Sequence, residues 1–178
     1  MKYGDDMIKI VNCDLMLATE DVIAHQVNCR GKMGSGVARQ VREMFPEAYR
    51  DYKEIVNRAE HLTYELCSAK RIFRNDVRSP LLGHCQIVPV ERQGRTILIA
   101  NLFAQERYGY DGERYTDYEA FEHCIDTLRI QCEAAHVTRI AMPYKIGCCR
   151  GGGDWNKVYD IIDKGLSGFD VVLYRYQG

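Results

Sequence analysis

The sequence lacks the long apolar runs and the targeting signals that mark membrane and secreted proteins. No apolar run approaches the roughly 18 residues that span a bilayer, and Ile97–Ala100 has only the length of a buried strand. The N-terminal residues Met1–Asp6 contain no apolar signal segment. We therefore expect a flexible tail over residues 1–6, no membrane association and a cytoplasmic location.

The sequence also lacks an excess of charge of either sign. Its 24 basic and 25 acidic residues give a net charge of −1 at pH 7. A nearly neutral chain offers no general attraction for a polyanion, and no motif combines aromatic with basic residues. This balance disfavours a nucleic-acid-binding protein, although a nucleic acid carrying a recognised small group could still be a substrate.

Paired cysteine motifs are missing too, although the chain contains eight cysteines. The thiols are scattered, and no C-x-x-C pair of the kind that holds zinc occurs. Several fall at positions that a strand or helix would bury, where a reduced cysteine acts as a small apolar side chain. We expect no metal site and no disulfide framework.

Strands alternate with helices along a chain that has no repeat, low-complexity run or polar linker. This alternation predicts one layered α/β domain spanning residues 1–178. We expect strands over 8–11, 21–28, 86–90, 96–102, 139–142 and 170–174, with a turn at Gln93-Gly94 in the middle. Helices are expected after Gly36 and ending before Pro46, over 49–59, after the capping-box pattern Thr116-x-x-Glu119, and through 155–162.

Two glycine-rich loops each lie between an expected strand and an expected helix, at Gly31–Gly36 and Gly147–Gly153. Glycine allows positive φ and lets a ligand approach the backbone closely. A helix N-terminus adds free N–H groups and the positive end of the helix dipole. Together these features form phosphate cradles, so two loops in one small domain suit a diphosphate.

Each loop alone could equally be a tight structural turn, and the common nucleotide-binding motifs do not fit. The sequence contains no G-x-x-x-x-G-K-[ST], which excludes a P-loop. The first loop does not read G-x-G-x-x-G, and it follows the second strand rather than the first, which disfavours a Rossmann site.

The order of motifs resembles the macro domain family, whose members bind ADP-ribose and its derivatives. The resemblance runs from Ile8 to Tyr176 and rests on four segments taken together. These are Asn12–Leu15, Ala24–Asn28, Gly34–Ala38, and Met142–Gly147 leading into Gly152–Trp155. It implies a three-layer α/β/α fold with a mixed central sheet. It looks most like the branch of ADP-ribose 1''-phosphate phosphatases and ADP-ribosyl hydrolases.

The resemblance also implies binding roles for named residues. Asp14 would accept a hydrogen bond from the adenine amino group beside Leu15, Asn28 would hold the distal ribose, and Tyr176 or Tyr174 would stack on adenine. The backbone of both loops would hold the diphosphate and distal ribose, through Gly34, Ser35, Gly36, Val37, Gly147, Cys148, Cys149, Arg150, Gly151, Gly152 and Gly153. In each case a structural role is the alternative: Asp14 could cap a turn, Asn28 could bond its own loop, and Tyr174 could be core.

His25 and Asp154 are the main candidates for catalysis, with Asn28 beside them. Residues at matching places in the resembling phosphatases are proposed to act on the terminal phosphate. His25, expected at a strand end that points toward the first loop, could shuttle a proton, and Asp154 could orient water. The alternatives are a satisfied strand histidine and a helix N-cap. We weigh a thiol nucleophile at Cys148 or Cys149 less, because neither has a base nearby in the sequence. No cofactor is expected.

One departure from the family pattern concerns the lysine that the ester- and thymidine-cleaving hydrolases of this branch use. In an ungapped comparison its place is taken by Gln105, which cannot act as a nucleophile. Cys149 also replaces a glycine common in relatives. The sequence therefore predicts binding of ADP-ribose or ADP-ribose 1''-phosphate, with phosphatase activity. The alternatives are a non-enzymatic reader and a hydrolase that removes ADP-ribose from a protein or nucleic acid.

Overall fold

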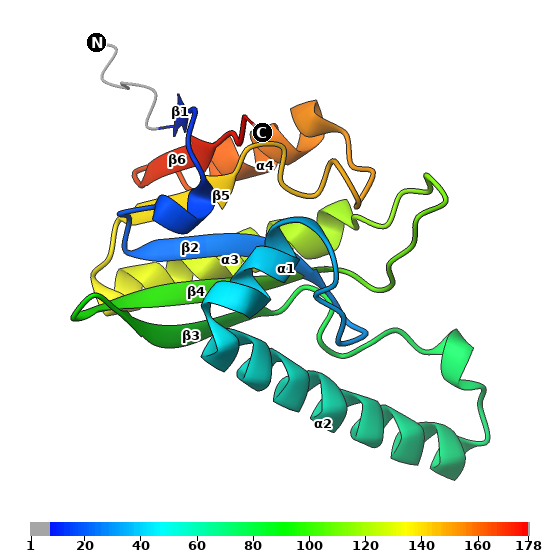
Figure 1. Ribbon diagram of the computed structural model, residues 1–178. Coiled ribbons are helices and arrows are strands. Elements are labelled where there is room, and N and C mark those ends of the chain that lie inside the picture. The colour runs from blue at the N-terminus through cyan, green and yellow to red at the C-terminus, as the bar shows by residue number, and fades with distance from the viewer. Residues whose placement is uncertain (1–7, 178) are drawn as a thin grey trace.

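The computed structural model describes residues 8–177, and the expected tail at 1–6 lies outside them. Six strands form one sheet with helices on both faces (Figure 1). The strands are β1 (Ile8–Val11), β2 (Val22–Asn28), β3 (Cys85–Arg92), β4 (Arg95–Gln105), β5 (Arg139–Pro143) and β6 (Asp170–Tyr174). The helices are α1 (Gly36–Met44), α2 (Pro46–Lys70), α3 (Tyr118–Ala135) and α4 (Trp155–Gly165), with short 3₁₀ turns η1 (Leu15–Leu17) and η2 (Arg74–Asp76).

The sheet has the strand order β1-β6-β5-β2-β4-β3 and is mixed, as expected. Every neighbouring pair is parallel except β3 and β4, which form an antiparallel hairpin. Gln93 and Gly94 form its turn, and both have positive φ. Because β2, β4 and β5 are parallel, their carboxyl ends lie at one edge of the sheet, the usual place for a ligand in an α/β fold.

Apolar clusters on both faces of the sheet create the three layers. On one face, Phe121 and Leu128 of α3 and Val158 and Ile162 of α4 pack in a cluster that includes Leu102. The other face is covered by α1 and α2, which contribute buried side chains from Val41 to Ala59. This arrangement confirms the expected α/β/α architecture.

The start of α3 differs from the capping-box prediction. Asp117, not Thr116, is the N-cap, and its side chain accepts a hydrogen bond from the amide of Ala120 at 2.9 Å. Thr116 is buried and donates its hydroxyl to the carbonyl of Gly147 at 2.7 Å. The pattern was misread because Thr116 has a tertiary partner that no local motif reveals.

Pro46 ends one helix and begins the next. The helix α1 stops at Met44, as expected, and Pro46 occupies the first turn of α2, where its missing N–H costs nothing. The helix over 49–59 is confirmed, but α2 has 25 residues and reaches Lys70. Its C-terminal half extends away from the sheet (Figure 1).

The eight cysteines are all free thiols, and five of them are buried. Among residues 8–177, no group of histidine, cysteine and carboxylate side chains is arranged to hold a metal ion. Over the same residues, no helix has both the length and the apolar character that crossing a membrane requires.

Candidate ligand-binding site

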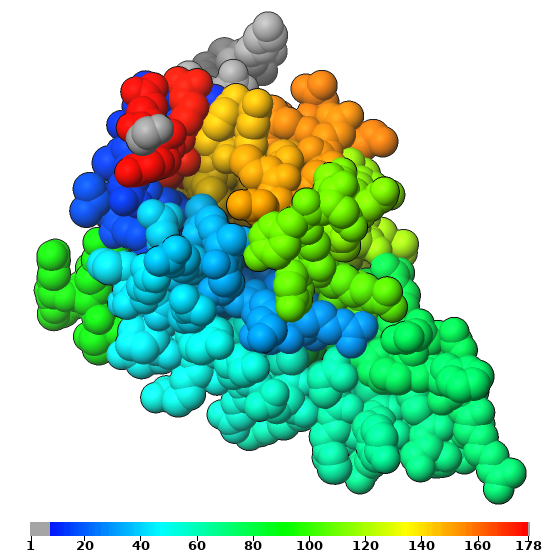
Figure 2. Space-filling view, turned by 45° about the vertical axis from the view of Figure 1, so that its right-hand side comes forward, coloured from blue at the N-terminus to red at the C-terminus, as the bar shows by residue number. Residues whose placement is uncertain are grey.

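A cavity of about 490 Å³ opens at the carboxyl ends of β2, β4 and β5. Three segments surround it: the first glycine loop, the second glycine loop, and the segment that follows β4. Figure 2 shows these segments, in blue, orange and yellow-green, meeting on one face of the molecule. The two loops that the sequence singled out therefore lie on opposite sides of one pocket.

The first loop leaves the N-terminus of α1 free to bind a ligand. Ser35 is the N-cap residue, but its side chain makes no capping hydrogen bond. Asp117 and Asp154 do cap α3 and α4 in this way. An added Cβ at Gly34 or Gly36 would meet nothing within 4 Å, so open space lies beside the backbone here. The first amides of α1 thus lack the side-chain acceptor that usually satisfies them.

The second loop is packed too tightly to accept side chains. Gly147 and Gly152 have positive φ. A Cβ on Gly151 would lie 2.3 Å from Oγ1 of Thr116 and 2.4 Å from the carbonyl oxygen of Gly147. The amide of Gly153 donates to the same carbonyl at 3.0 Å. These glycines are required by close approach of the backbone to its own neighbours.

Among residues 8–177, the side chains that line the cavity include cations and no carboxylate. Lys32, Lys145 and Arg150 contribute to the lining, and neither Asp nor Glu does. The guanidinium carbon of Arg150 lies 4.9 Å from the ring centroid of Tyr110, which joins the second loop to the segment after β4. A chain of net charge −1 therefore has a locally positive pocket.

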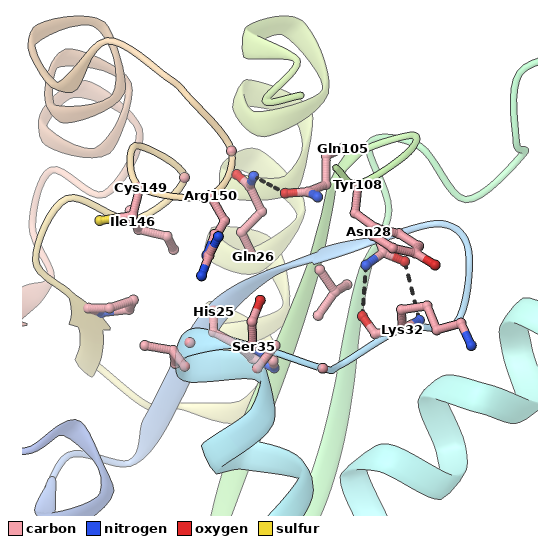
Figure 3. Close-up of a pocket in the computed structure, with 18 of the residues that line it drawn as sticks. His25, Gln26, Asn28, Lys32, Ser35, Gln105, Tyr108, Ile146, Cys149 and Arg150 are labelled. Atoms are coloured by element: carbon pink, nitrogen blue, oxygen red, sulfur yellow. Dashed lines mark hydrogen bonds between the residues drawn. The ribbon is translucent and has the colours of Figure 1, made fainter. Parts of the chain in front are cut away.

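Gln26, Gln105 and Thr116 form a polar cluster beside the second loop, and Figure 3 shows the bond between Gln26 and Gln105. The Nε2 of Gln26 lies 2.7 Å from Oε1 of Gln105 and 2.8 Å from Oγ1 of Thr116, and it donates to both. Gln105 also donates to the carbonyl of Arg107 at 3.0 Å. Gln105 is thus engaged in hydrogen bonds that shape the pocket wall.

His25 lies in the interior of β2 rather than at the strand end, and only 1% of it is exposed. Its Nε2 is 2.6 Å from Oδ1 of Asn101, and its buried Nδ1 has no partner within the described residues. Burial lowers the pKa of His25 to about 4, against an ordinary value of 6.5, although the bond to Asn101 opposes this. His25 is therefore neutral at physiological pH, and it contributes to the cavity wall.

Asn28 uses its side chain to shape the first loop. Its Nδ2 donates to the carbonyl of Lys32 at 2.7 Å, and its Oδ1 accepts from the amide of Arg30 at 2.9 Å. The hydroxyl of Tyr52 donates to the same oxygen at 3.0 Å. Figure 3 shows the Asn28 amide turned toward Lys32. This is the structural role weighed above, and contact with a ribose stays a prediction.

The structure brings ten of the predicted site residues together around the cavity and leaves seven outside its lining. Those in the lining are His25, Asn28, Gly34, Ser35, Gly36, Val37, Gly147, Cys149, Arg150 and Gly151. Those outside it are Asp14, Leu15, Cys148, Gly152, Gly153, Asp154 and Tyr176. The predicted diphosphate region therefore coincides with the cavity, whereas the predicted adenine contacts lie outside its lining.

Several residues outside the lining have a structural role or an environment that the structure defines. Asp154 is exposed and caps α4 by accepting from the amide of Asn156 at 2.9 Å. Asp14 caps η1 in the same way through the amide of Met16. Tyr176 is 69% exposed. Burial raises the pKa of Cys148 to about 11, so this thiol is protonated at neutral pH and is a poor nucleophile.

Sequence reasoning missed several residues that line the cavity. Tyr108 and Tyr110 come from the loop after β4, and Tyr144 and Lys145 come from the end of β5. Tyr144 and Lys145 could have been predicted, because they directly follow a strand and so lie at the same sheet edge as the glycine loops. Tyr108 and Tyr110 could not have been predicted from the sequence, because no periodic pattern covers residues 106–115.

The arrangement of strands and helices matches known macrodomain structures. The macrodomain of DarG from Thermus aquaticus superposes with a TM-score of 0.70 at 22% identity, over 96% of this chain and 98% of that one. A structure described as DarTG from Thermosipho africanus in complex with ADP-ribose gives a TM-score of 0.69 at 15% identity, over 95% of this chain and 41% of that one. The chain therefore has the macrodomain fold, as the resemblance implied.

Sequence comparison adds a curated relative. A protein of Saccharomyces cerevisiae (strain YJM789) named ADP-ribose 1''-phosphate phosphatase is 27% identical over 119 residues, which is 66% of this chain. The match covers 56% of that relative, so the chain spans about half the length of the curated relatives it matches. No family model matches the sequence.

Proposed function

We propose that this domain binds ADP-ribose in the cavity between its glycine loops and hydrolyses ADP-ribose 1''-phosphate. The observation that carries the binding proposal is the charge of the pocket wall, where Lys32, Lys145 and Arg150 are joined by no carboxylate from the described part of the chain. A diphosphate brings two negative charges that such a wall attracts. A cavity of about 490 Å³ also falls within the range of about 300–1,000 Å³ that is typical of small-molecule sites.

Backbone amides provide the second half of this proposal. The uncapped first turn of α1 points its N–H groups and the positive end of its dipole at the cavity. Across the cavity, the amides of Cys149, Arg150 and Gly151 have no backbone acceptor within residues 8–177. Two sets of free donors on opposite walls suit a ligand with two linked phosphates.

The hydrolytic part of the proposal rests on His25 and on the name of the curated relatives. Nδ1 of His25 is buried and has no hydrogen-bond partner among residues 8–177, and His25 contributes to the cavity lining. Water would attack phosphorus while the bond from phosphorus to the 1''-oxygen breaks. The proton released by the water would pass through His25 to the departing 1''-oxygen, giving ADP-ribose and inorganic phosphate.

An assay of phosphate release from ADP-ribose 1''-phosphate tests the hydrolytic proposal. We expect turnover by the wild-type protein and a loss of about a hundredfold or more in His25→Gln, the lower range for removal of a general base. The exposed His61, which pairs with Glu65 on α2, provides a matched control in His61→Gln. Equal turnover in wild type and His25→Gln would refute the role of His25, and no turnover in wild type would refute hydrolysis.

A non-enzymatic ADP-ribose reader is the second candidate. It is favoured by a cavity lining to which no Asp or Glu between residues 8 and 177 contributes, and by the engagement of Gln105 with Gln26. A reader would bind ADP-ribose in calorimetry and release no phosphate from ADP-ribose 1''-phosphate. It could also hold ADP-ribose that is still attached to a protein or nucleic acid, since only the ADP-ribose group would enter the pocket.

A further inference from the structure

A row of polar side chains crosses three neighbouring strands on the sheet face that α1 and α2 cover. His25 of β2 is paired in register with Asn101 of β4, and Asn101 is paired with Gln86 of β3. Asn101 is fully buried. On one side of this row lies the apolar cluster with Ile23 and Ile99, and on the other the cluster with Val27 and Phe103. His25 and Asn101 are buried, whereas Gln86 is half-buried. Buried polar groups between two apolar clusters are unfavourable unless each finds a hydrogen-bond partner.

Each member of the row is hydrogen-bonded to the next, and the last reaches the backbone of α2. Nε2 of His25 is 2.6 Å from Oδ1 of Asn101, and Nδ2 of Asn101 donates to Oε1 of Gln86 at 3.0 Å. Nε2 of Gln86 donates to the carbonyl oxygen of Asp51 at 3.1 Å. The chain of bonds therefore runs from the cavity wall to a main-chain acceptor on the neighbouring helix.

The backbone carbonyl at the end fixes the direction of every bond in the row. A carbonyl oxygen can only accept, so Gln86 must present its NH₂ group to Asp51 and its oxygen to Asn101. Asn101 must then present its NH₂ group to Gln86 and its oxygen to His25. An amide oxygen also only accepts, so the proton of the neutral imidazole must be on Nε2. By elimination, Nδ1 carries the free lone pair.

Within the described residues, Nδ1 is the one hydrogen-bonding atom of the row that has no partner. It is buried, and His25 lines the cavity beneath the first glycine loop. Leaving a buried acceptor unsatisfied is unfavourable, and a donor that enters the cavity relieves that cost. An O–H group is the donor that fits the proposed chemistry, either as attacking water or as the 1''-hydroxyl of ADP-ribose.

We propose that Asn101 and Gln86 are positioning residues that hold His25 in its Nε2–H tautomer and so keep Nδ1 as an acceptor for an O–H donor in the cavity. The inference deepens the proposed function and rests on it for the identity of that donor. Neither positioning residue contributes to the cavity lining. Their effect on the ligand is transmitted through the imidazole ring.

Long-range ¹H–¹⁵N NMR of the histidine side chains, recorded on the 178-residue chain without added ligand, tests the tautomer. The chain has five histidines, and His25→Gln identifies the resonances of His25. We expect a single Nε2–H tautomer in the wild type and a mixture in Gln86→Leu, which frees the Asn101 amide to turn. Gln131→Leu is the matched control, because Gln131 also donates to a backbone carbonyl, that of Cys85, but on the opposite face of the sheet.

A titration with ADP-ribose then tests whether Nδ1 of His25 accepts a hydrogen bond when the ligand binds. We expect the Nδ1 resonance of His25 to shift as the wild type is saturated. We also expect Gln86→Leu to bind ADP-ribose about tenfold more weakly, a change of about 1.4 kcal/mol. A thermal unfolding curve confirms that each variant is folded, and Asn101→Leu, which removes the direct partner, is the second variant should Gln86→Leu fail to fold.

The possible failures are distinguishable. An Nδ1–H tautomer in the wild type, or an unchanged tautomer in a folded Gln86→Leu, would overturn the positioning role whether or not ADP-ribose binds. A wild type that binds ADP-ribose without any shift at Nδ1 would overturn the acceptor role. Failure of the wild type to bind ADP-ribose would refute the proposed function, and the ligand-free spectra would still decide the roles of Asn101 and Gln86.

Discussion

Gln26 donates a hydrogen bond from Nε2 to Oε1 of Gln105 at 2.7 Å, across two neighbouring parallel strands. The same Nε2 also donates to Thr116, whose hydroxyl holds the carbonyl of Gly147. Gln105 is therefore part of the hydrogen-bond network that supports the second glycine loop. This gives Gln105 a structural reason for its identity that is independent of any reaction.

Replacing Gln105 tests that support. In Gln105→Ala, Gln26 loses one acceptor, and we expect a loss of about 1 kcal/mol in the free energy of unfolding, together with weaker ADP-ribose binding. Urea unfolding and calorimetry measure the two effects. In a double-mutant cycle with Gln26→Ala, the two changes should be less than additive. Strict additivity would show that the bond between these side chains contributes nothing.

The buried His25 makes stability depend on pH. Its pKa is about 4 in the folded protein and about 6.5 when unfolded, so the unfolded chain binds more protons between these values. The contribution of neutral His25 is complete above pH 6.5 and is lost as the pH falls toward 4, by about 3 kcal/mol in all. Burial lowers the pKa of His84 as well, which adds to the same slope.

Urea unfolding at several pH values measures this slope. We expect His25→Gln to remove most of the loss between pH 6.5 and 4, whereas His61→Gln, on the exposed face of α2, should keep the wild-type slope. An equally steep slope in His25→Gln would show that His25 is not the source.

The glycines of the two loops should respond differently to a methyl group. Gly151→Ala places Cβ against the backbone carbonyl of Gly147, and we expect it to cost about 1–3 kcal/mol of stability, the usual range for overpacking. Gly34→Ala meets open space, so stability should be kept while ADP-ribose binding weakens, because the ligand would occupy that space. Equal thermal stability of the two variants would contradict the packing described for the second loop.

Asp154 should behave first as a helix cap. In Asp154→Ala, α4 loses the acceptor for the amide of Asn156, and about 1 kcal/mol of stability should be lost. Asp154→Asn keeps a side-chain oxygen and should retain most of it. Phosphate release from ADP-ribose 1''-phosphate by both variants then tests the catalytic role. A larger loss of turnover in Asp154→Asn than in His25→Gln would favour Asp154 as the main catalytic group.

Local patterns in the sequence were enough to place the strands, the hairpin turn and both glycine loops. The apolar runs at β2 and β4 and the glycines before α1 and α4 each have a local physical cause. The start of α3 was misassigned because Thr116 bonds to Gly147, which is 31 residues away. The strand order could not be predicted either, because β1 pairs with β6 at the other end of the chain.

The candidate site was predictable only in part for the same reason. The glycine loops and His25 carry recognisable motifs, so they were found. Asn101 is 76 residues from His25 and looks like an ordinary polar residue in a buried strand. Tyr110 meets Arg150 only because two loops converge at one edge of the sheet. Such relationships depend on the completed fold.

Calorimetric titration of ADP-ribose into the wild type and Arg150→Gln tests the central claim most directly. Arg150 projects from the second loop at the positive wall, and Arg129→Gln, an exposed arginine paired with Glu133 on α3, is the control. We predict one binding site in the wild type and in Arg129→Gln, and about tenfold weaker binding in Arg150→Gln, about 1.4 kcal/mol. No binding heat at millimolar ADP-ribose, or equal affinity in all three proteins, would contradict a diphosphate site between the glycine loops.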